Sequence, residues 1–181
     1  LDGVSTGLII SGDGNTITFP DQQNVGQYTV VATNPLTGCN SIMNGTVTVI
    51  QNPLPLVFNI TGGGSYCEGG TGIDVGLSGS ENGISYELMI DGVLTGNIIS
   101  GSGNALSFGL QTQNGIYSVV ATNNITLCTN IMSGTATITV DPLPVADAGI
   151  NQSIPHGTST TLYGNATGGS GDYSFLWSPS S

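Results

Sequence analysis

The sequence contains no lysine and no arginine, although average usage predicts on the order of 20 basic side chains at this length. Eleven acidic residues and one histidine give a formal net charge of -11. A phosphate backbone or an anionic lipid surface would repel such a chain, and no binding by counterion release is available. We therefore exclude nucleic acid and anionic membrane surfaces as partners. Amide cross-links and lysine-linked pilin joints are excluded too, because both need an amine side chain.

Long apolar runs are also missing. None approaches the roughly 18 residues of a transmembrane helix, and Leu1-Asp2-Gly3 is not the start of a signal peptide. We therefore expect a mature, soluble excerpt with no membrane insertion. The cysteine count is low and odd, at three, which indicates either a free thiol or a partner outside the excerpt.

What the sequence does contain is typical of β-structure. It has 29 glycines, 38% apolar residues and only 6% charged residues. Valine, isoleucine and threonine alternate with polar residues, whereas runs of leucine, alanine and glutamate are absent. This composition predicts an all-β chain with many turns.

The sequence repeats itself at an interval of 89 residues. VVATNPLTGC at 30–39 returns as VVATNNITLC at 119–128, and residues 1–55 align with 90–144 without a gap, with 30 identical pairs. A period near 90 is close to the length of a small β-sandwich domain. Pro-Leu-Pro at 53–55 and at 142–144 marks the junctions, because proline stiffens an extended connection. We therefore expect the C-terminal part of one domain at 1–54, a complete domain at 55–143 and the first part of another at 144–181.

Alternation places about seven short strands in the complete domain. The opening strand is expected near 56–60. The Asp91-Gly92 pair predicts a tight hairpin turn with positive φ, and a further strand is expected after it, near 96–99. The glycines at 62–64 lack the lysine of a phosphate-binding loop and are expected to be flexible turns. The residues expected to point inward are Ile73, Val75, Leu77, Tyr86, Leu88, Ile90, Leu106, Phe108, Tyr117, Val119, Ala121, Ala136, Ile138 and Val140. Val31 and Val120 are apolar on the outward face, which indicates either a central strand or a contact surface.

Two motifs resemble known modules. GIYSV at 115–119 and GQYTV at 26–30 resemble the tyrosine corner of immunoglobulin-like sandwiches, with Tyr117 and Tyr28 as the corner residues. ADAG at 146–149, followed by GGSGDYSFLWSPSS at 168–181, resembles the start of a polycystic-kidney-disease-type (PKD) domain. Tyr173, Phe175 and Trp177 have the same parity along the chain, so Trp177 is expected in the core of that domain.

The second motif is also similar to repeats of very large secreted Bacteroidota proteins, including gliding-motility adhesins. The resemblance implies an elongated tandem array of immunoglobulin-like and PKD-like antiparallel β-sandwiches at the cell surface. It also implies an adhesive or scaffolding role.

The cysteines have predicted partners in such a sandwich. Cys67 precedes the second strand and Cys128 follows the sixth, positions that we expect at one end of the domain, so a Cys67–Cys128 disulfide is predicted. Cys39 is the repeat equivalent of Cys128, and its partner is expected upstream of Leu1. The alternative is three reduced thiols.

Candidate residues for chemistry are sparse. His156 lies in a turn without a second histidine or a nearby cysteine, and Glu87 and Asp91 flank a hairpin for which the turn is a sufficient explanation. Asp141 and Asp147 bracket the second junction, where a calcium ion is the one cofactor alternative. We therefore expect no catalytic residue and no enzyme activity.

The resulting hypothesis is a stalk or filament segment of an extracellular bacterial adhesin. Its partners are neighbouring domains of the same chain, and surface glycans or other copies of the filament are alternatives. Three other functions stay open: a spacer in a large secreted polysaccharide-degrading enzyme, a glycan-binding module, and a subunit that polymerises by strand exchange.

Overall fold

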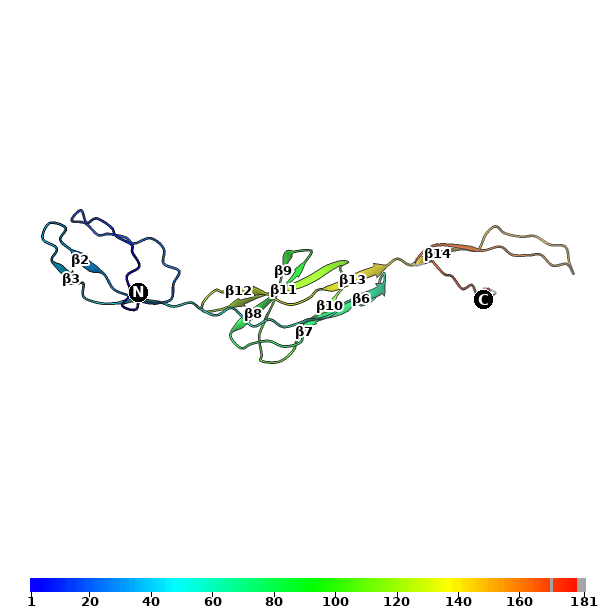
Figure 1. Cartoon of the computed structure of the whole chain (residues 1–181). Helices are drawn as coiled ribbons and strands as arrows, with labels where there is room; N and C mark the ends of the chain where they lie inside the picture. The colour runs from blue at the N-terminus through cyan, green and yellow to red at the C-terminus, as the bar shows by residue number, and fades with distance from the viewer. Residues whose placement is uncertain (170, 179–181) are drawn as a thin grey trace. The chain divides into compact units, whose positions relative to one another are not determined.

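The computed structural model describes residues 1–169 and 171–178 and shows an all-β protein, with no helix among these residues. The chain divides into two compact units, Leu1–Pro53 and Leu54–Ser181. Figure 1 shows the strands of each unit. The two units are described separately below.

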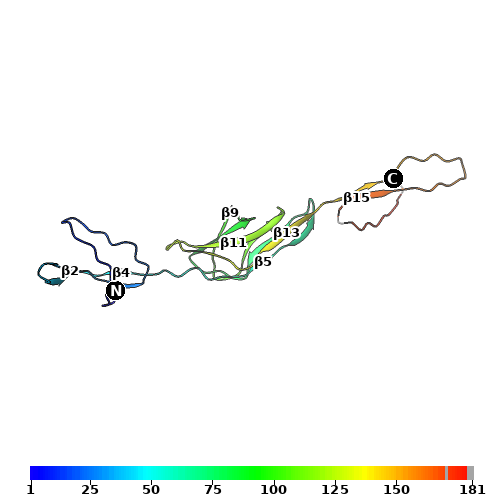
Figure 2. The same cartoon turned by 45° about the horizontal axis from the view of Figure 1, so that its top comes forward.

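Residues 54–143 form a sandwich of two sheets. One sheet has the order β10-β7-β5, and the other has the order β6-β13-β11-β8-β9, with β12 paired to β11. Figure 2 shows the same strands from a second direction. The strands are β5 (Ile60–Gly62), β6 (Gly64–Cys67), β7 (Ile73–Leu77), β8 (Ile84–Ile90), β9 (Val93–Ser100), β10 (Leu106–Gln111), β11 (Gly115–Asn123), β12 (Thr129–Ile131) and β13 (Ala136–Asp141).

Side chains from both sheets share one hydrophobic core. Ten of the fourteen residues expected to point inward are buried, and the other four, Ile73, Ile90, Leu106 and Val140, are half-buried. The alternation of apolar and polar residues therefore predicted the core faces of these strands correctly. Ile84 and Met132 are also buried, and alternation did not identify them.

The first strand of the sandwich crosses from one sheet to the other at Gly62, Gly63 and Gly64. β5 pairs with β7, whereas β6 pairs with β13 in the opposite sheet. All three glycines have positive φ, and a Cβ on Gly62 would lie 1.9 Å from the carbonyl oxygen of Asp74. The interpretation of 62–64 as flexible turns is therefore wrong. These residues are a bend between two strand segments, and close backbone approach requires glycine there.

The first unit contains four short strands. They are β1 (Gly26–Tyr28), β2 (Val31–Thr33), β3 (Asn40–Ile42) and β4 (Val47–Val49). β1 pairs with β4 and β2 pairs with β3. With the 89-residue offset, these pairs match β11–β13 and β11–β12 of the complete sandwich.

Residues 4–11 and 17–22 are the repeat equivalents of β9 and β10, yet they form no strand. In the complete sandwich β9 pairs with β8, and β10 pairs with β7. Residues 1–53 contain no equivalent of β7 or β8, so these segments lack a hydrogen-bonding neighbour. Strand formation in this chain therefore follows the presence of a partner strand more closely than local sequence.

After the sandwich, β14 (Pro144–Asp147) pairs with β15 (Asn165–Gly168). Tyr173, Phe175 and Trp177 belong to no strand, and Trp177 is 50% exposed. The expectation of a core tryptophan is therefore wrong for this structure.

We predict that Gly62→Ala lowers the free energy of unfolding of the 54–143 sandwich by about 3 kcal/mol, because the positive φ and the Asp74 carbonyl both oppose a Cβ. Gly69→Ala is the matched control, since Gly69 also has positive φ but no atom within 4 Å. Its expected cost is about 1 kcal/mol. Urea unfolding of the two variants measures the difference, and equal costs would contradict a strand bend that depends on Gly62.

Candidate functional site

The chain enters and leaves the sandwich through strands that run parallel and side by side. β6 pairs with β13 from Gly64↔Ile138 to Cys67↔Asp141. The contact extends in both directions: Ser133 N–H donates to the Phe58 carbonyl at 2.9 Å, and Glu68 N–H donates to the Asp141 carbonyl at 2.8 Å. We call the paired segments 58–68 and 133–141 the parallel ladder. Because the pairing is parallel, its first residue and its last residue lie at opposite ends of the sandwich.

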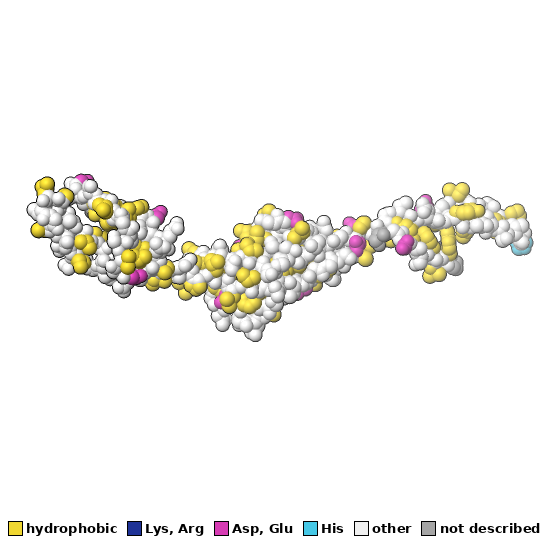
Figure 3. Space-filling model, viewed as in Figure 1, with side chains coloured by type: hydrophobic (Ala, Val, Ile, Leu, Met, Phe, Trp, Pro, Cys, Tyr) yellow, Lys and Arg dark blue, Asp and Glu magenta, His cyan; other side chains and the backbone are white. Residues whose placement is uncertain are grey.

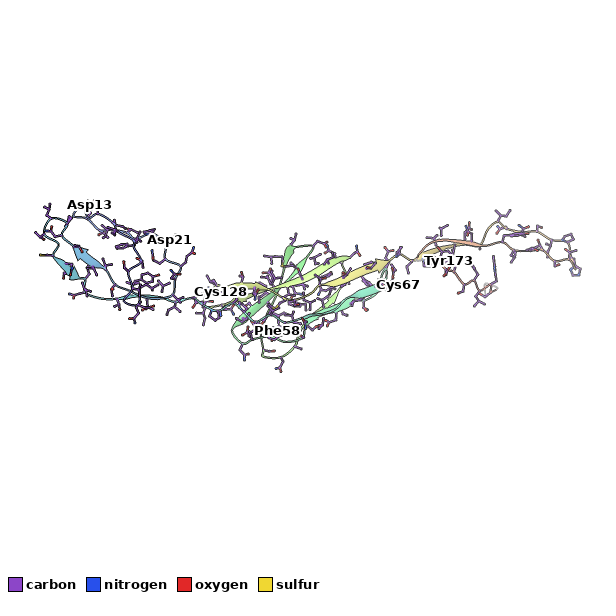
Figure 4. All side chains as sticks on the ribbon, viewed as in Figure 1. Asp13, Asp21, Phe58, Cys67, Cys128 and Tyr173 are labelled. Atoms are coloured by element: carbon purple, nitrogen blue, oxygen red, sulfur yellow. The ribbon has the colours of Figure 1, made fainter. Side chains whose placement is uncertain are left out.

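The predicted disulfide between Cys67 and Cys128 is not present in the structure. Cys67 lies beside Asp141, whereas the Cys128 carbonyl accepts a hydrogen bond from Asn123 N–H at the far end of β11. Figure 4 shows the two cysteines at opposite ends of the sandwich.

Strand register allows their separation to be estimated. Three residue steps along β13, from Asp141 to Ile138, and eight along β11, from Gly115 to Asn123, make eleven steps. At roughly 3.3 Å per residue this is about 36 Å, against the roughly 4.4–6.8 Å between Cα atoms that a disulfide needs.

The error in the cysteine prediction lies in strand direction. β6 is parallel to β13 and β11 is antiparallel to it, so β6 and β11 run in opposite directions. β5 precedes β6 in the same strand, and its partner β7 is antiparallel to it. β7 and β11 therefore run the same way, and a cysteine before β7 and one after β11 lie at opposite ends. Cys39 is exposed. Its upstream partner was predicted by analogy with the Cys67–Cys128 pair, and the complete sandwich does not contain that pair.

Both tyrosine corners have the hydrogen bond that defines them. The Tyr117 hydroxyl donates to the Gln113 carbonyl at 2.8 Å, and the Tyr28 hydroxyl donates to the Asn24 carbonyl at 2.7 Å. Tyr117 is buried, whereas Tyr28 is half-buried. Burial raises the pKa of the Tyr117 phenol, although the Gln113 hydrogen bond acts in the opposite direction. The pKa of Tyr86, also in the core, is raised mainly by burial as well.

The Asp-Gly hairpin turn has the predicted backbone. Asp91 and Gly92 both have positive φ, at 49° and 81°, as a type I′ turn requires. The Asp91 carboxylate also accepts a hydrogen bond from Ile116 N–H at 2.9 Å, so it connects the turn to β11. Asp2 makes the same contact with Gln27 N–H at 2.9 Å.

The loop after β11 is closed by Asn123. Its side-chain oxygen accepts hydrogen bonds from the N–H groups of Ile125 and Thr126. Leu127 in this loop has a positive φ of 58° and an exposed side chain, whereas its repeat equivalent is Gly38, with a φ of 71°. A leucine therefore occupies a backbone conformation that favours glycine.

The acidic residues do not gather into a site. No group of three His, Cys, Asp or Glu side chains that could hold a metal ion occurs among residues 1–169 and 171–178. The Asp147 carboxylate accepts from Gly149 N–H at 2.8 Å, and Asp141 lies at the end of the parallel ladder. Glu87 accepts from Gly96 N–H. Calcium at Asp141 and Asp147 stays an alternative without structural support.

The surface offers shallow depressions and isolated apolar residues. One depression lies beside β2 and β3, and another lies beside the Asp91 turn with that aspartate as its one carboxylate. Val120 is half-buried in the middle of its sheet, where Glu87 and Ile131 flank it on the neighbouring strands. Figure 3 shows scattered acidic side chains and no Lys or Arg on the visible face.

Comparison with protein-family models and with curated proteins finds no match to this chain. No helix in the described part is long and apolar enough to cross a membrane.

The raised tyrosine pKa values predict alkaline destabilisation. The fold favours the neutral phenols of Tyr86 and Tyr117, so stability is constant well below the unfolded pKa of about 10 and falls as pH rises through and above it. Tyr117→Phe should cost about 1 kcal/mol at neutral pH, because its hydrogen bond is lost, and should reduce the alkaline fall. Urea unfolding between neutral pH and pH 11 measures both. Tyr163→Phe, at an exposed tyrosine, is the control, and an unchanged alkaline slope in Tyr117→Phe would contradict the assignment.

Leu127→Gly should stabilise the sandwich by about 1 kcal/mol, because glycine adopts this φ without strain. Ile125→Gly, at an exposed residue of the same loop without positive φ, should not stabilise it. Thermal unfolding of the two variants distinguishes these outcomes, and a lower melting temperature for Leu127→Gly would refute the strain.

Proposed function

We propose that the chain is a stalk or filament segment of a bacterial extracellular surface adhesin, built from repeated immunoglobulin-like β-sandwich domains. The observation that carries the proposal is the parallel ladder of residues 54–143. In this proposal the segment provides reach and mechanical resistance, and no residue turns over a substrate.

Tension along the chain would act on the parallel ladder directly. The pull is applied at the N-terminal end of 58–68 and at the C-terminal end of 133–141, and these points lie at opposite ends of the ladder. The two segments must therefore slide past each other, which loads many hydrogen bonds at the same time. An antiparallel terminal pair would instead open from one end, one bond after another.

Several further features support an extracellular tandem array. The 89-residue repeat and the Pro-Leu-Pro junctions are those of a copied module. Tyr117 supports the immunoglobulin-like assignment through its corner hydrogen bond, as does the opening strand that pairs with both sheets. The absence of both lysine and arginine leaves no cleavage site for trypsin-like proteases, as suits a protein outside the cell.

The other functions have less support. A spacer in a secreted polysaccharide-degrading enzyme would also need resistance to tension along the chain. This function differs from a stalk only in the domains that the segment connects. Glycan binding would need an exposed aromatic platform. The aromatic residues with large exposure are Tyr163, Phe175 and Trp177, and none of the three belongs to a strand that would hold them in one plane.

The mechanical proposal predicts a dependence on pulling direction. Handles attached at Pro55 and Pro142 load the ladder in shear, whereas handles at Glu68 and Pro142 open it from one end. Force spectroscopy of the whole chain should give a higher unfolding force for the first pair. That event should release up to roughly 30 nm of chain, the extended length of about 89 residues.

The second handle position is the control, because the sandwich and its hydrogen bonds are unchanged. Equal forces in the two geometries would show that the ladder does not bear the load and would remove the main support for a stalk.

A further inference from the structure

Residues 55–57 lie just before the parallel ladder and belong to no strand. Two side chains hold their backbone. The Asn130 amide donates to the Pro55 carbonyl at 2.8 Å, and Leu56 N–H donates to the Glu81 carboxylate at 2.6 Å. We call residues 55–57 the entry strap. Side chains therefore fasten the strap, whereas backbone pairing holds the ladder that follows it.

Both contacts are made by one peptide group. The carbonyl of Pro55 and the N–H of Leu56 belong to the same planar unit, which is trans and therefore directs its oxygen and its hydrogen to opposite sides of the chain. Asn130 and Glu81 thus bind this unit from its two sides. Because the unit is rigid, a rotation that breaks one hydrogen bond also displaces the partner of the other.

The two side chains come from separate parts of the sandwich. Asn130 lies on β12, which pairs with β11, whereas Glu81 lies in the loop that connects β7 with β8. The Glu81 N–H donates to the Tyr86 hydroxyl at 2.9 Å, and Tyr86 is buried. The hydrophobic core therefore fixes the backbone that presents the Glu81 carboxylate to the strap.

The entry strap is bound less firmly than the ladder. Ser133 N–H donates to the Phe58 carbonyl, and Ile60 N–H donates to the Ser133 carbonyl, both at 2.9 Å. Phe58 and Ile60 also pack against the core. In the strap Pro55 is buried, but the two residues after it are more than half exposed. Segments with few buried apolar contacts open locally, at a lower free energy than the whole domain.

We propose that Glu81 and Asn130 form a clamp on this peptide group, and that the entry strap detaches from the clamp reversibly and as one unit while the parallel ladder stays closed. The clamp is the first contact that the chain makes with the sandwich. Its two hydrogen bonds open together, because they share one rigid peptide unit.

The mechanical meaning of the strap rests on the proposed function. Tension on the chain ahead of the sandwich reaches the clamp before it reaches the ladder. Release of three residues lengthens this connection by up to about 1 nm. The strap then yields under a small load and binds again when the load falls, and the ladder is sheared only by larger loads.

Amide hydrogen exchange of the whole chain measures the detachment without applied force. Leu56 N–H should exchange about tenfold or more slowly than in an unfolded peptide, because a charged acceptor binds it, but faster than Ile60 N–H. Urea below the unfolding range should leave the Leu56 rate unchanged, since opening of the strap exposes little surface. The same urea should accelerate exchange at Ile60.

Asn130→Ala tests whether the two contacts act together, because Asn130 does not itself bind the Leu56 N–H. This substitution should raise the Leu56 exchange rate about fivefold. Asn97→Ala is the matched control, since it removes a side-chain amide bond to the Phe108 carbonyl instead, and it should leave the Leu56 rate unchanged. Glu81→Ala should abolish the protection of Leu56, and Glu81→Gln should retain part of it.

Three results would overturn the proposal. Exchange at Leu56 as fast as in an unfolded peptide would mean that the clamp does not hold, and equal urea dependence at Leu56 and Ile60 would mean that the strap does not detach separately. An unchanged Leu56 rate in Asn130→Ala would show two independent contacts. If that variant does not fold, the urea comparison in the unsubstituted chain still decides. The pulling experiment concerns the ladder alone, so either proposal can fail without the other.

Discussion

The pairing of β8 with β11 is the interaction on which the rest of this structure depends. β11 is the longest strand, and β8 pairs with it from Ile84↔Asn123 to Ile90↔Tyr117. On its other side β8 is the partner of β9. Without a β8 equivalent, residues 1–53 keep only the strand pairs that do not involve it, and the apolar residues of nearly the same sequence are left exposed. In the complete sandwich, β8 therefore provides both a hydrogen-bonding partner for its neighbouring strands and the apolar side chains that bury their inner faces.

Cohesion in the complete sandwich comes from apolar packing and backbone pairing. No disulfide joins Cys39, Cys67 and Cys128, which all lie in the described part of the chain, and a chain without lysine and arginine can form few ion pairs. The parallel ladder is the part of this pairing that closes the domain around its two chain ends. It depends on Gly62 and its neighbours, because the opening strand must leave one sheet and reach the other within a few residues. At this bend, the topology therefore requires the three glycines at 62–64.

The sequence predicted what short-range patterns control. Alternation identified most of the core, because the side chains of a strand alternate between its two faces. The Asp-Gly pair identified the turn at Asp91, and the Gly-x-Tyr motif identified the corner at Tyr117, because both depend on contacts within a few residues. The pairing of Cys67 with Cys128 failed, because it required the relative direction of strands in different sheets. Trp177 was assigned to a core by parity, but parity gives only the face of a strand. Whether the face that carries Trp177 is buried depends on other strands packing against it, and local alternation contains no information about those strands.

Comparison of the two copies of the repeat shows which contacts depend on local sequence and which depend on a closed core. The Asp2 and Asp91 carboxylates make the same contact at the same distance, and both tyrosine corners form, although only the second copy has a closed core. Asn34 and Asn123 likewise accept hydrogen bonds from the loops that follow them. The turn, the corner and the loop are therefore held by contacts within residues 1–53 themselves. The closed core of the second copy therefore adds strand pairing and apolar burial to local contacts that both copies already make.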